Sequence, residues 1–322
     1  MFQKLDGPEV IRLIDYCNAL GAVTVYVECD WRPEALAKYR CAHIVCPSRY
    51  LQHALQSSGS GAKVHFIPDP IEASLPAPHR QPGSSYRIVW TGSRANWPSL
   101  DVVRAILAEP EFRDLALVTI SDHHDATHAW EAATALQRWA DADVCVIPTS
   151  MTPHARAKSN NRLTQAMALG LPVVCGAIPA YADIVADGIN GFVCDSADRY
   201  RAAFRALRNA DVRHSVATEG WRFATDNYSL EGIISRWERL FHSLAPVGGG
   251  AKVHDWRGQL SEWTAWRRQQ AGVSLQFALI GCPSAVQCGR YLLQSQVAWP
   301  FQLAPFAAAL RKAQRKAGAQ LQ

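Results

Sequence analysis

The sequence predicts an α/β protein with parallel sheets, because short apolar runs alternate along the chain with segments of helical periodicity. The clearest unit spans residues 143–175. Val144, Cys145, Val146 and Ile147 form a continuous apolar run, as expected of a strand covered on both faces. Apolar residues then recur at helical spacing up to Gly170, and a second apolar run covers 172–175. A strand–helix–strand unit of this kind needs a right-handed crossover, and therefore a parallel sheet.

The first part of the chain predicts a partial Rossmann-like domain over residues 1–82. A helix is expected over 8–20, where Gly21 ends it, and a second helix begins after Ser48, a favourable N-cap residue. Strands are expected at 22–27, 43–46 and 63–67. These are only two or three βα units, fewer than a complete Rossmann domain contains.

A second α/β domain is predicted for residues 83–245, after a linker rich in proline and serine at 71–85. Its expected strands lie at 86–91, 115–120, 144–147, 172–175 and 191–194. Helices are expected at 99–108, 130–140, 159–170, 198–209, 211–226 and 229–243.

Residues 246–322 are predicted to be a glycine-rich linker followed by a helical, basic tail. Trp256, Trp263 and Trp266 share a helical stripe beside arginines. This pattern suits a helix docked on the protein's own surface, and it also suits peripheral contact with a membrane.

Composition excludes several classes of function. The net charge of +5 is small and the basic residues are scattered, so no nucleic-acid partner is expected. No GxGxxG motif follows a predicted strand, so no dinucleotide cofactor is expected. The motif at 121–125, Ser-Asp-His-His-Asp, follows no known ligand spacing, and no metal site is predicted there. Cysteines within apolar strands and the lack of a signal-peptide core predict a cytoplasmic protein with reduced thiols.

The loop and first helical turn at 158–162 predict an anion site. Lys158, Ser159, Asn160 and Arg162 lie at an expected helix N-terminus, where unpaired N–H groups and the helix dipole attract anions. Two cations at this end oppose the dipole unless an anion joins them. A solvated basic loop is the alternative interpretation.

Residues 158–192 resemble the C-terminal domain of GT-B retaining glycosyltransferases of family 4. The resemblance rests on Gln-Ala-Met-Ala-Leu-Gly-Leu-Pro-Val-Val at 165–174 and Asp-Gly-Ile-Asn-Gly-Phe at 187–192. It implies a GT-B-like fold with two Rossmann-type parallel-sheet domains, of which the N-terminal one is incomplete here. The family's E-x7-E positions fall on Ala157 and Gln165. By resemblance, Gln165 would contact the donor ribose.

The resemblance also assigns a donor-binding loop after the strand at 86–91. Gly92, Ser93, Arg94 and Asn96 stand where the family clasps the donor diphosphate. A glycine lets the backbone approach a ligand, and an arginine can make a forked contact with phosphate.

Two carboxylates, Glu28 and Asp30, follow the strand at 22–27. Because open α/β sheets bind ligands at the carboxyl ends of their strands, these are candidate acceptor-side residues. Solvation of an ordinary loop is the alternative.

The sequence thus predicts a metal-independent glycosyltransferase of the hexosyltransferase type. It would move a sugar from a nucleotide-diphosphate sugar to an acceptor hydroxyl with retention, and no residue is assigned a catalytic role. The shortened N-terminal domain suggests a late start, a reduced domain or completion by a partner. Since both family glutamates are replaced, a non-catalytic nucleotide-sugar-binding protein or partner subunit is the alternative.

Overall fold

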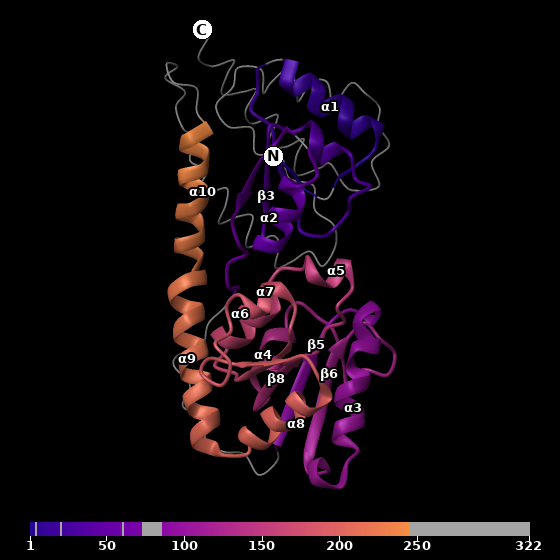
Figure 1. Cartoon of the computed structure of the whole chain (residues 1–322), viewed down its shortest axis with the longest axis vertical. Coiled ribbons are helices and arrows are strands. Elements are labelled where there is room, and N and C mark those ends of the chain that lie inside the picture. Colours follow the sequence, from indigo (N-terminus) through magenta and orange to yellow (C-terminus); the bar gives the residue numbers. More distant parts are fainter. Residues whose placement is uncertain (4, 20, 60, 73–85, 245–322) are drawn as a thin grey trace.

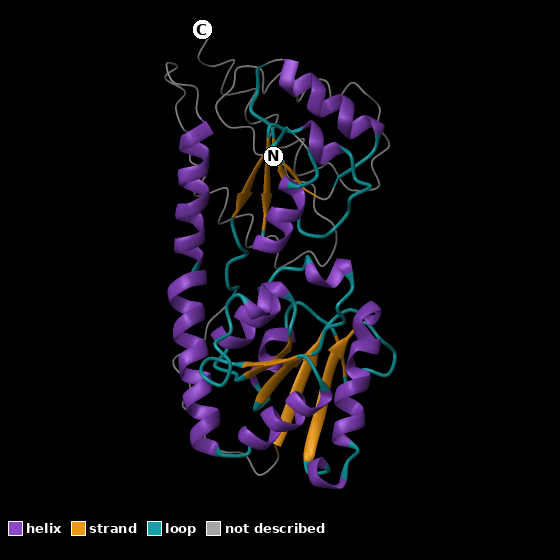
Figure 2. Cartoon of the chain, in the orientation of Figure 1, coloured by secondary structure: helices purple, strands orange, loops and turns teal. Residues whose placement is uncertain are grey.

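The computed structural model describes residues 1–244 except 4, 20, 60 and 73–85 (Figure 1). Two parallel sheets, each flanked by helices, lie one above the other along the long axis of the molecule (Figure 2). The predicted boundary at 82–83 and the predicted tail at 246–322 lie outside the described residues.

The first sheet has strand order β1-β2-β3-β4, and every neighbouring pair is parallel. Its strands are β1 (Phe2–Gln3), β2 (Val25–Val27), β3 (His43–Cys46) and β4 (Lys63–Phe66). Helix α1 (Pro8–Ala19), the 3-10 turn η1 (Ala37–Arg40) and helix α2 (Arg49–Gln56) accompany it. Ser48 caps α2 as predicted, since its hydroxyl accepts a hydrogen bond from the N–H of Leu51.

The second sheet has strand order β10-β9-β8-β5-β6-β7, again parallel throughout. Its strands are β5 (Tyr86–Thr91), β6 (Leu115–Ser121), β7 (His128–Ala129), β8 (Val144–Ile147), β9 (Val173–Gly176) and β10 (Phe192–Cys194). Two apolar clusters fill its opposite faces, and Val144 to Ile147 are buried throughout, as a strand covered on both sides must be.

Helices surround the second sheet. They are α3 (Asp101–Leu107), α4 (Ala135–Ala140), α5 (Pro153–Arg156), α6 (Asn161–Ala168), α7 (Pro179–Ala182), α8 (Ala197–Ala206) and α9 (Ala210–Tyr228), with 3-10 turns η2 (Arg94–Leu100) and η3 (Pro110–Phe112). Gly170 ends the α6 region with a φ of 71°, in agreement with its predicted role as a helix stop. The helix predicted at 130–140 begins only at Ala135, because residues before it form β7 and a turn.

Helix α10 (Leu230–Leu244) packs on the first sheet. Ile233, Trp237 and Leu240 join Val25 and Val45 in one apolar cluster. In Figure 1, α9 and α10 run end to end along both domains. The chain therefore crosses between the domains twice, near residues 67–72 and at Ser229, which separates the two helices.

The carboxyl ends of both sheets face the junction between the domains. The Ser48 hydroxyl, just after β3, donates to the carbonyl of Ala157 at 3.4 Å. Arg156 lies over the ring of Tyr50, with 5.1 Å between the guanidinium and the ring centre. The residues that follow the strands of both sheets therefore meet here. Among the described residues, no helix is long and apolar enough to cross a membrane.

Candidate functional site

The loop after β5 brings Gly92, Ser93, Arg94 and Asn96 together at the carboxyl edge of the second sheet. The Asn96 amide donates to the Ser93 hydroxyl at 3.0 Å, which closes the turn. The N–H of Arg94 donates to the Asp122 carboxylate at 2.6 Å, and the Arg94 guanidinium lies 3.9 Å from the same carboxylate. This backbone hydrogen bond is the main cause that holds the pKa of Asp122 below its ordinary value. The Arg94 side chain is 77% exposed, so it can contact a ligand.

Gly92 is the closest approach between this loop and helix α6. A Cβ on Gly92 would stand 2.6 Å from the buried ring of Trp90 and 3.1 Å from a guanidinium nitrogen of Arg162. The same Arg162 nitrogen donates to the carbonyl of Thr91 at 2.9 Å. The packing of Trp90 and Arg162 therefore requires a glycine at position 92, whether or not a ligand also approaches it.

Helix α6 begins at Asn161, so Asn160 and not Ser159 is its N-cap residue, and the predicted start was early. Asn160 is 4% exposed and its amide nitrogen donates to the Tyr228 hydroxyl at 2.9 Å. Its amide oxygen is buried and has no hydrogen-bond partner among the described residues. Because the Tyr228 hydroxyl can both donate and accept, either orientation of the Asn160 amide keeps this hydrogen bond. Lys158 and Ser159 lie half-buried just before this end.

Arg162 has a structural function besides its predicted contact with an anion. It joins the end of β5 to α6 through Thr91, and it lies beside the buried Tyr181. Burial raises the pKa of Tyr181, and the neighbouring Arg162 charge acts in the opposite direction. The guanidinium therefore lies between the β5 loop and the first turn of α6.

The two positions of the family's E-x7-E motif are both occupied in contacts at the domain junction. Ala157 is fully buried and belongs to the apolar cluster of the first domain. The Gln165 side chain is buried, and its amide oxygen accepts a hydrogen bond from the N–H of Glu72 at 2.6 Å. Gln165 thus holds the segment that joins the domains. Its predicted contact with a ribose stays a prediction.

The acceptor-side candidate Glu28 is fully buried, so an acceptor cannot reach it in this structure. Its carboxylate pairs with Lys38 at 3.0 Å and with Arg32 at 2.9 Å. Lys38 also donates to the carbonyl of Arg32. Two cations and two backbone N–H groups hold this carboxylate, which is how a buried charge is normally satisfied. Spacing placed Glu28 at the carboxyl edge of the sheet but could not show its pairing with Arg32 and Lys38, and its contact with an acceptor stays a prediction. Asp30 remains partly exposed.

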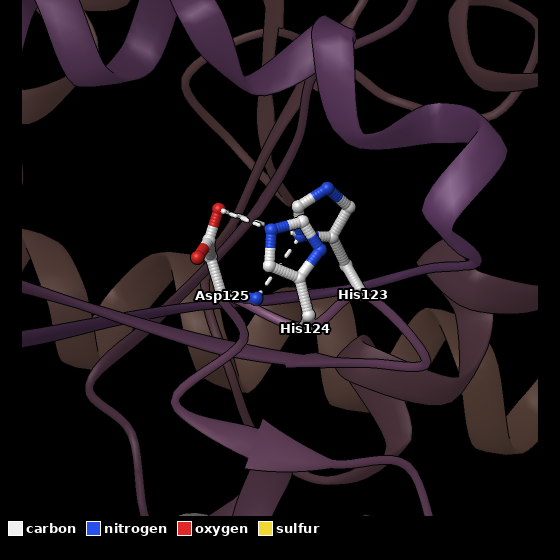
Figure 3. Close-up of side chains that lie close together, drawn as sticks. All are labelled: His123, His124 and Asp125. Atoms are coloured by element: carbon white, nitrogen blue, oxygen red, sulfur yellow. Dashed lines mark hydrogen bonds and ion pairs between the residues drawn. The ribbon is translucent and has the colours of Figure 1, made fainter.

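His123, His124 and Asp125 cluster in the loop after β6 (Figure 3). Each offers one possible ligand atom, and these three atoms lie within 4.8 Å of one another. The Nδ1 atom of His123 already accepts a hydrogen bond from the N–H of Asp125 at 3.1 Å. The His123 ring also stacks on Trp97, with 4.0 Å between ring centres and planes 3° apart. The His124 ring stacks on His123 with 4.3 Å between ring centres, and the Arg104 guanidinium lies 4.3 Å from the centre of the Trp97 ring. The faces of Trp97 and His123 are therefore covered by neighbouring side chains, and the loop offers a possible set of metal ligands.

Comparison with known proteins links the second domain to one family. Residues 85–210 match the family model described as glycosyl transferases group 1, while no curated protein matches the chain in sequence. The second domain is therefore similar in sequence to that family.

Solved structures show the same fold. The pneumococcal O-GlcNAc transferase GtfA, in complex with UDP and GlcNAc, aligns with a TM-score of 0.55 and 13% identity over 72% of this chain and 54% of its own. Anabaena Alr3699/HepE, in complex with UDP, aligns with a TM-score of 0.58 and 14% identity over 73% of this chain and 76% of its own. Sucrose-phosphate synthase from Thermosynechococcus elongatus aligns with a TM-score of 0.55 and 14% identity over 68% of this chain and 67% of its own. The two facing parallel-sheet domains are a GT-B fold, which confirms the predicted fold class. The chain spans about half the length of the GtfA chain.

Three further residues of the candidate site were not singled out from the sequence. Asp122 anchors the donor-side loop, Trp97 carries the histidine stack, and Tyr228 holds the N-cap of α6. Asp122 could have been found, since it directly follows a strand. Tyr228 lies 68 residues from its partner, and nothing in the spacing joins them.

Proposed function

We propose that this chain transfers a hexose from a nucleotide-diphosphate sugar to an acceptor hydroxyl, with retention and without a metal ion. The observation that carries the proposal is the meeting of two phosphate-binding elements. The loop at Gly92–Arg94 and the N-terminus of α6 are joined through Arg162, at the carboxyl edge of a parallel sheet.

The charges at this edge suit a leaving diphosphate. Arg94 is exposed, and Lys158 lies half-buried ahead of the α6 N-terminus. N–H groups and cations held in place before reaction stabilise negative charge without reorganisation, which lowers the barrier to departure of the nucleotide diphosphate. The exposed His124 ring, which stacks on His123, would offer the base an aromatic contact. The relatives GtfA and HepE were solved with UDP, so UDP is the nucleotide to test first.

The test compares UDP with uridine by titration calorimetry. Arg94→Ala and Lys158→Ala should each weaken UDP binding by about ten- to a hundred-fold, because a charge-assisted contact contributes about 1.5–3 kcal/mol. Uridine binding should change little. Arg113→Ala is the matched control, since Arg113 is an exposed arginine just before β6, at the opposite edge of the sheet. Equal UDP affinity in the parent and both variants would refute the phosphate site.

Metal independence needs its own titration, because the His123–Asp125 cluster could bind an ion. UDP binding should persist in the presence of a chelator. Complete dependence on magnesium, manganese or zinc would contradict this part of the proposal.

A second candidate is a nucleotide-sugar-binding protein without catalytic activity. It is favoured because Ala157 and Gln165 stand at the two E-x7-E positions, so neither position carries a carboxylate. Both residues instead make contacts at the domain junction. Release of UDP from UDP-sugars in the presence of candidate acceptor sugars, measured over many turnovers, separates the two. Tight UDP-sugar binding without turnover across such a panel would favour the binding protein.

A further inference from the structure

An open groove of about 550 Å³ lies on the first domain, between α2, β4 and α10. Its polar lining comes from Arg49 and Gln52 of α2, His65 of β4, and Arg236, Arg239 and Ser243 of α10. None of the proposed donor-binding residues lines it. The groove is therefore a separate feature of the surface.

The groove is strongly basic. Among the residues that the structure describes, three arginines and no carboxylate line it. Arg236 and Arg239 are spaced i, i+3 on α10, so their side chains share one face of the helix and repel each other. Neither forms an ion pair with the described residues, whereas all three arginines of α8 pair with carboxylates. A ligand that carries negative charge would remove this repulsion.

The groove is also structurally defined. The Arg49 guanidinium lies 4.7 Å from the centre of the Phe66 ring, which holds it over an apolar floor. Gln52 donates to the carbonyl of Val64 at 3.1 Å and so fastens α2 to the edge strand. The cations thus come from two elements, α2 and α10, on either side of the depression.

We propose that this arginine groove binds a phosphate group of a ligand other than the sugar donor. Arginine guanidinium groups match phosphate through parallel N–H bonds, and the groove offers three of them. Two sources share this chemistry: the head group of an anionic phospholipid, and a soluble phosphate ester. The inference is independent of the proposed sugar transfer.

The experiment uses the full chain and two probes. One arm measures co-sedimentation with vesicles of phosphatidylglycerol and phosphatidylcholine, against vesicles of phosphatidylcholine alone. The other arm titrates glycerol 3-phosphate by calorimetry. Arg236→Glu/Arg239→Glu should weaken whichever probe binds by at least tenfold, and Arg49→Gln, from the opposite wall, should weaken the same probe. Binding of vesicles only identifies a lipid, and binding of the ester identifies a soluble ligand.

The control is Arg113→Glu/Arg222→Glu, which makes the same change in net charge on exposed arginines of the second domain. It should bind the probe like the parent. UDP titration of the groove variants checks that they are folded and keeps a failure of the groove distinct from a failure of the donor site. If the parent binds neither probe at millimolar ester or lipid, or if the groove variants and the control bind alike, the proposal is wrong.

Discussion

Replacing Gly92 by alanine tests the contact that joins the donor loop to the core. The new Cβ would stand 2.6 Å from the Trp90 ring and 3.1 Å from Arg162. Trp90 is fully buried in the apolar cluster between β5, α3 and α8, so its ring has no room to retreat. The loop must therefore shift by several tenths of an ångström.

Overpacking of this kind typically costs about 1–3 kcal/mol. For a chain of 322 residues, that corresponds to a fall in Tm of roughly 1–2 °C for each kcal/mol. UDP affinity should also fall, because the shift moves the Gly92 and Ser93 backbone that faces the ligand. Urea unfolding measures the first effect and calorimetry the second.

A double-mutant cycle with Trp90→Phe isolates the cause. The smaller ring removes atoms that the new Cβ meets, so Gly92→Ala should cost clearly less in the Trp90→Phe background. Gly61→Ala is the matched control, because a Cβ there meets nothing within 4 Å. If Gly92→Ala costs the same free energy of unfolding in both backgrounds, or no more than Gly61→Ala, the steric argument is refuted.

Three further predictions concern buried polar groups. Asn160→Ala should lower the free energy of unfolding by about 1–3 kcal/mol, because it leaves the Tyr228 hydroxyl unpaired, and adding Tyr228→Phe should not double the loss in urea unfolding. Glu28→Gln should lower the free energy of unfolding by about 3–5 kcal/mol, since it leaves Arg32 and Lys38 without their carboxylate partner. A loss below about 1 kcal/mol in urea unfolding would contradict the buried pairing. Burial, together with nearby cationic groups, lowers the pKa values of His43 and His65 from 6.5, so the unfolded chain binds more protons just below that pH. Their contribution to stability is therefore present above pH 6.5 and declines as the pH falls through the window below it. Thermal unfolding at pH 5.5 and 7.5 should show a smaller pH dependence for His43→Gln/His65→Gln, and an unchanged dependence would contradict the linkage.

The sequence by itself determined the local elements and the edge of the sheet at which the site lies. Apolar runs such as 144–147 mark covered strands because successive side chains of a strand alternate between its faces, and both faces here are apolar. The cap at Ser48 and the stop at Gly170 follow from backbone hydrogen bonding and φ preference, which are properties of a few neighbouring residues. The loop at Gly92–Asn96 was placed at a carboxyl edge for the same reason, since it directly follows a strand.

Only the tertiary structure decided which of the residues at that edge remain accessible. Glu28 lies at the predicted position but is covered and paired with Lys38, and Gln165 accepts a hydrogen bond from the segment between the domains. Helix α10 returns to the first sheet because Trp237 and its apolar neighbours match the face left open there. A periodic pattern shows which face of a helix or strand is apolar. It does not show which distant segment covers that face, because this depends on contacts between residues far apart in the chain.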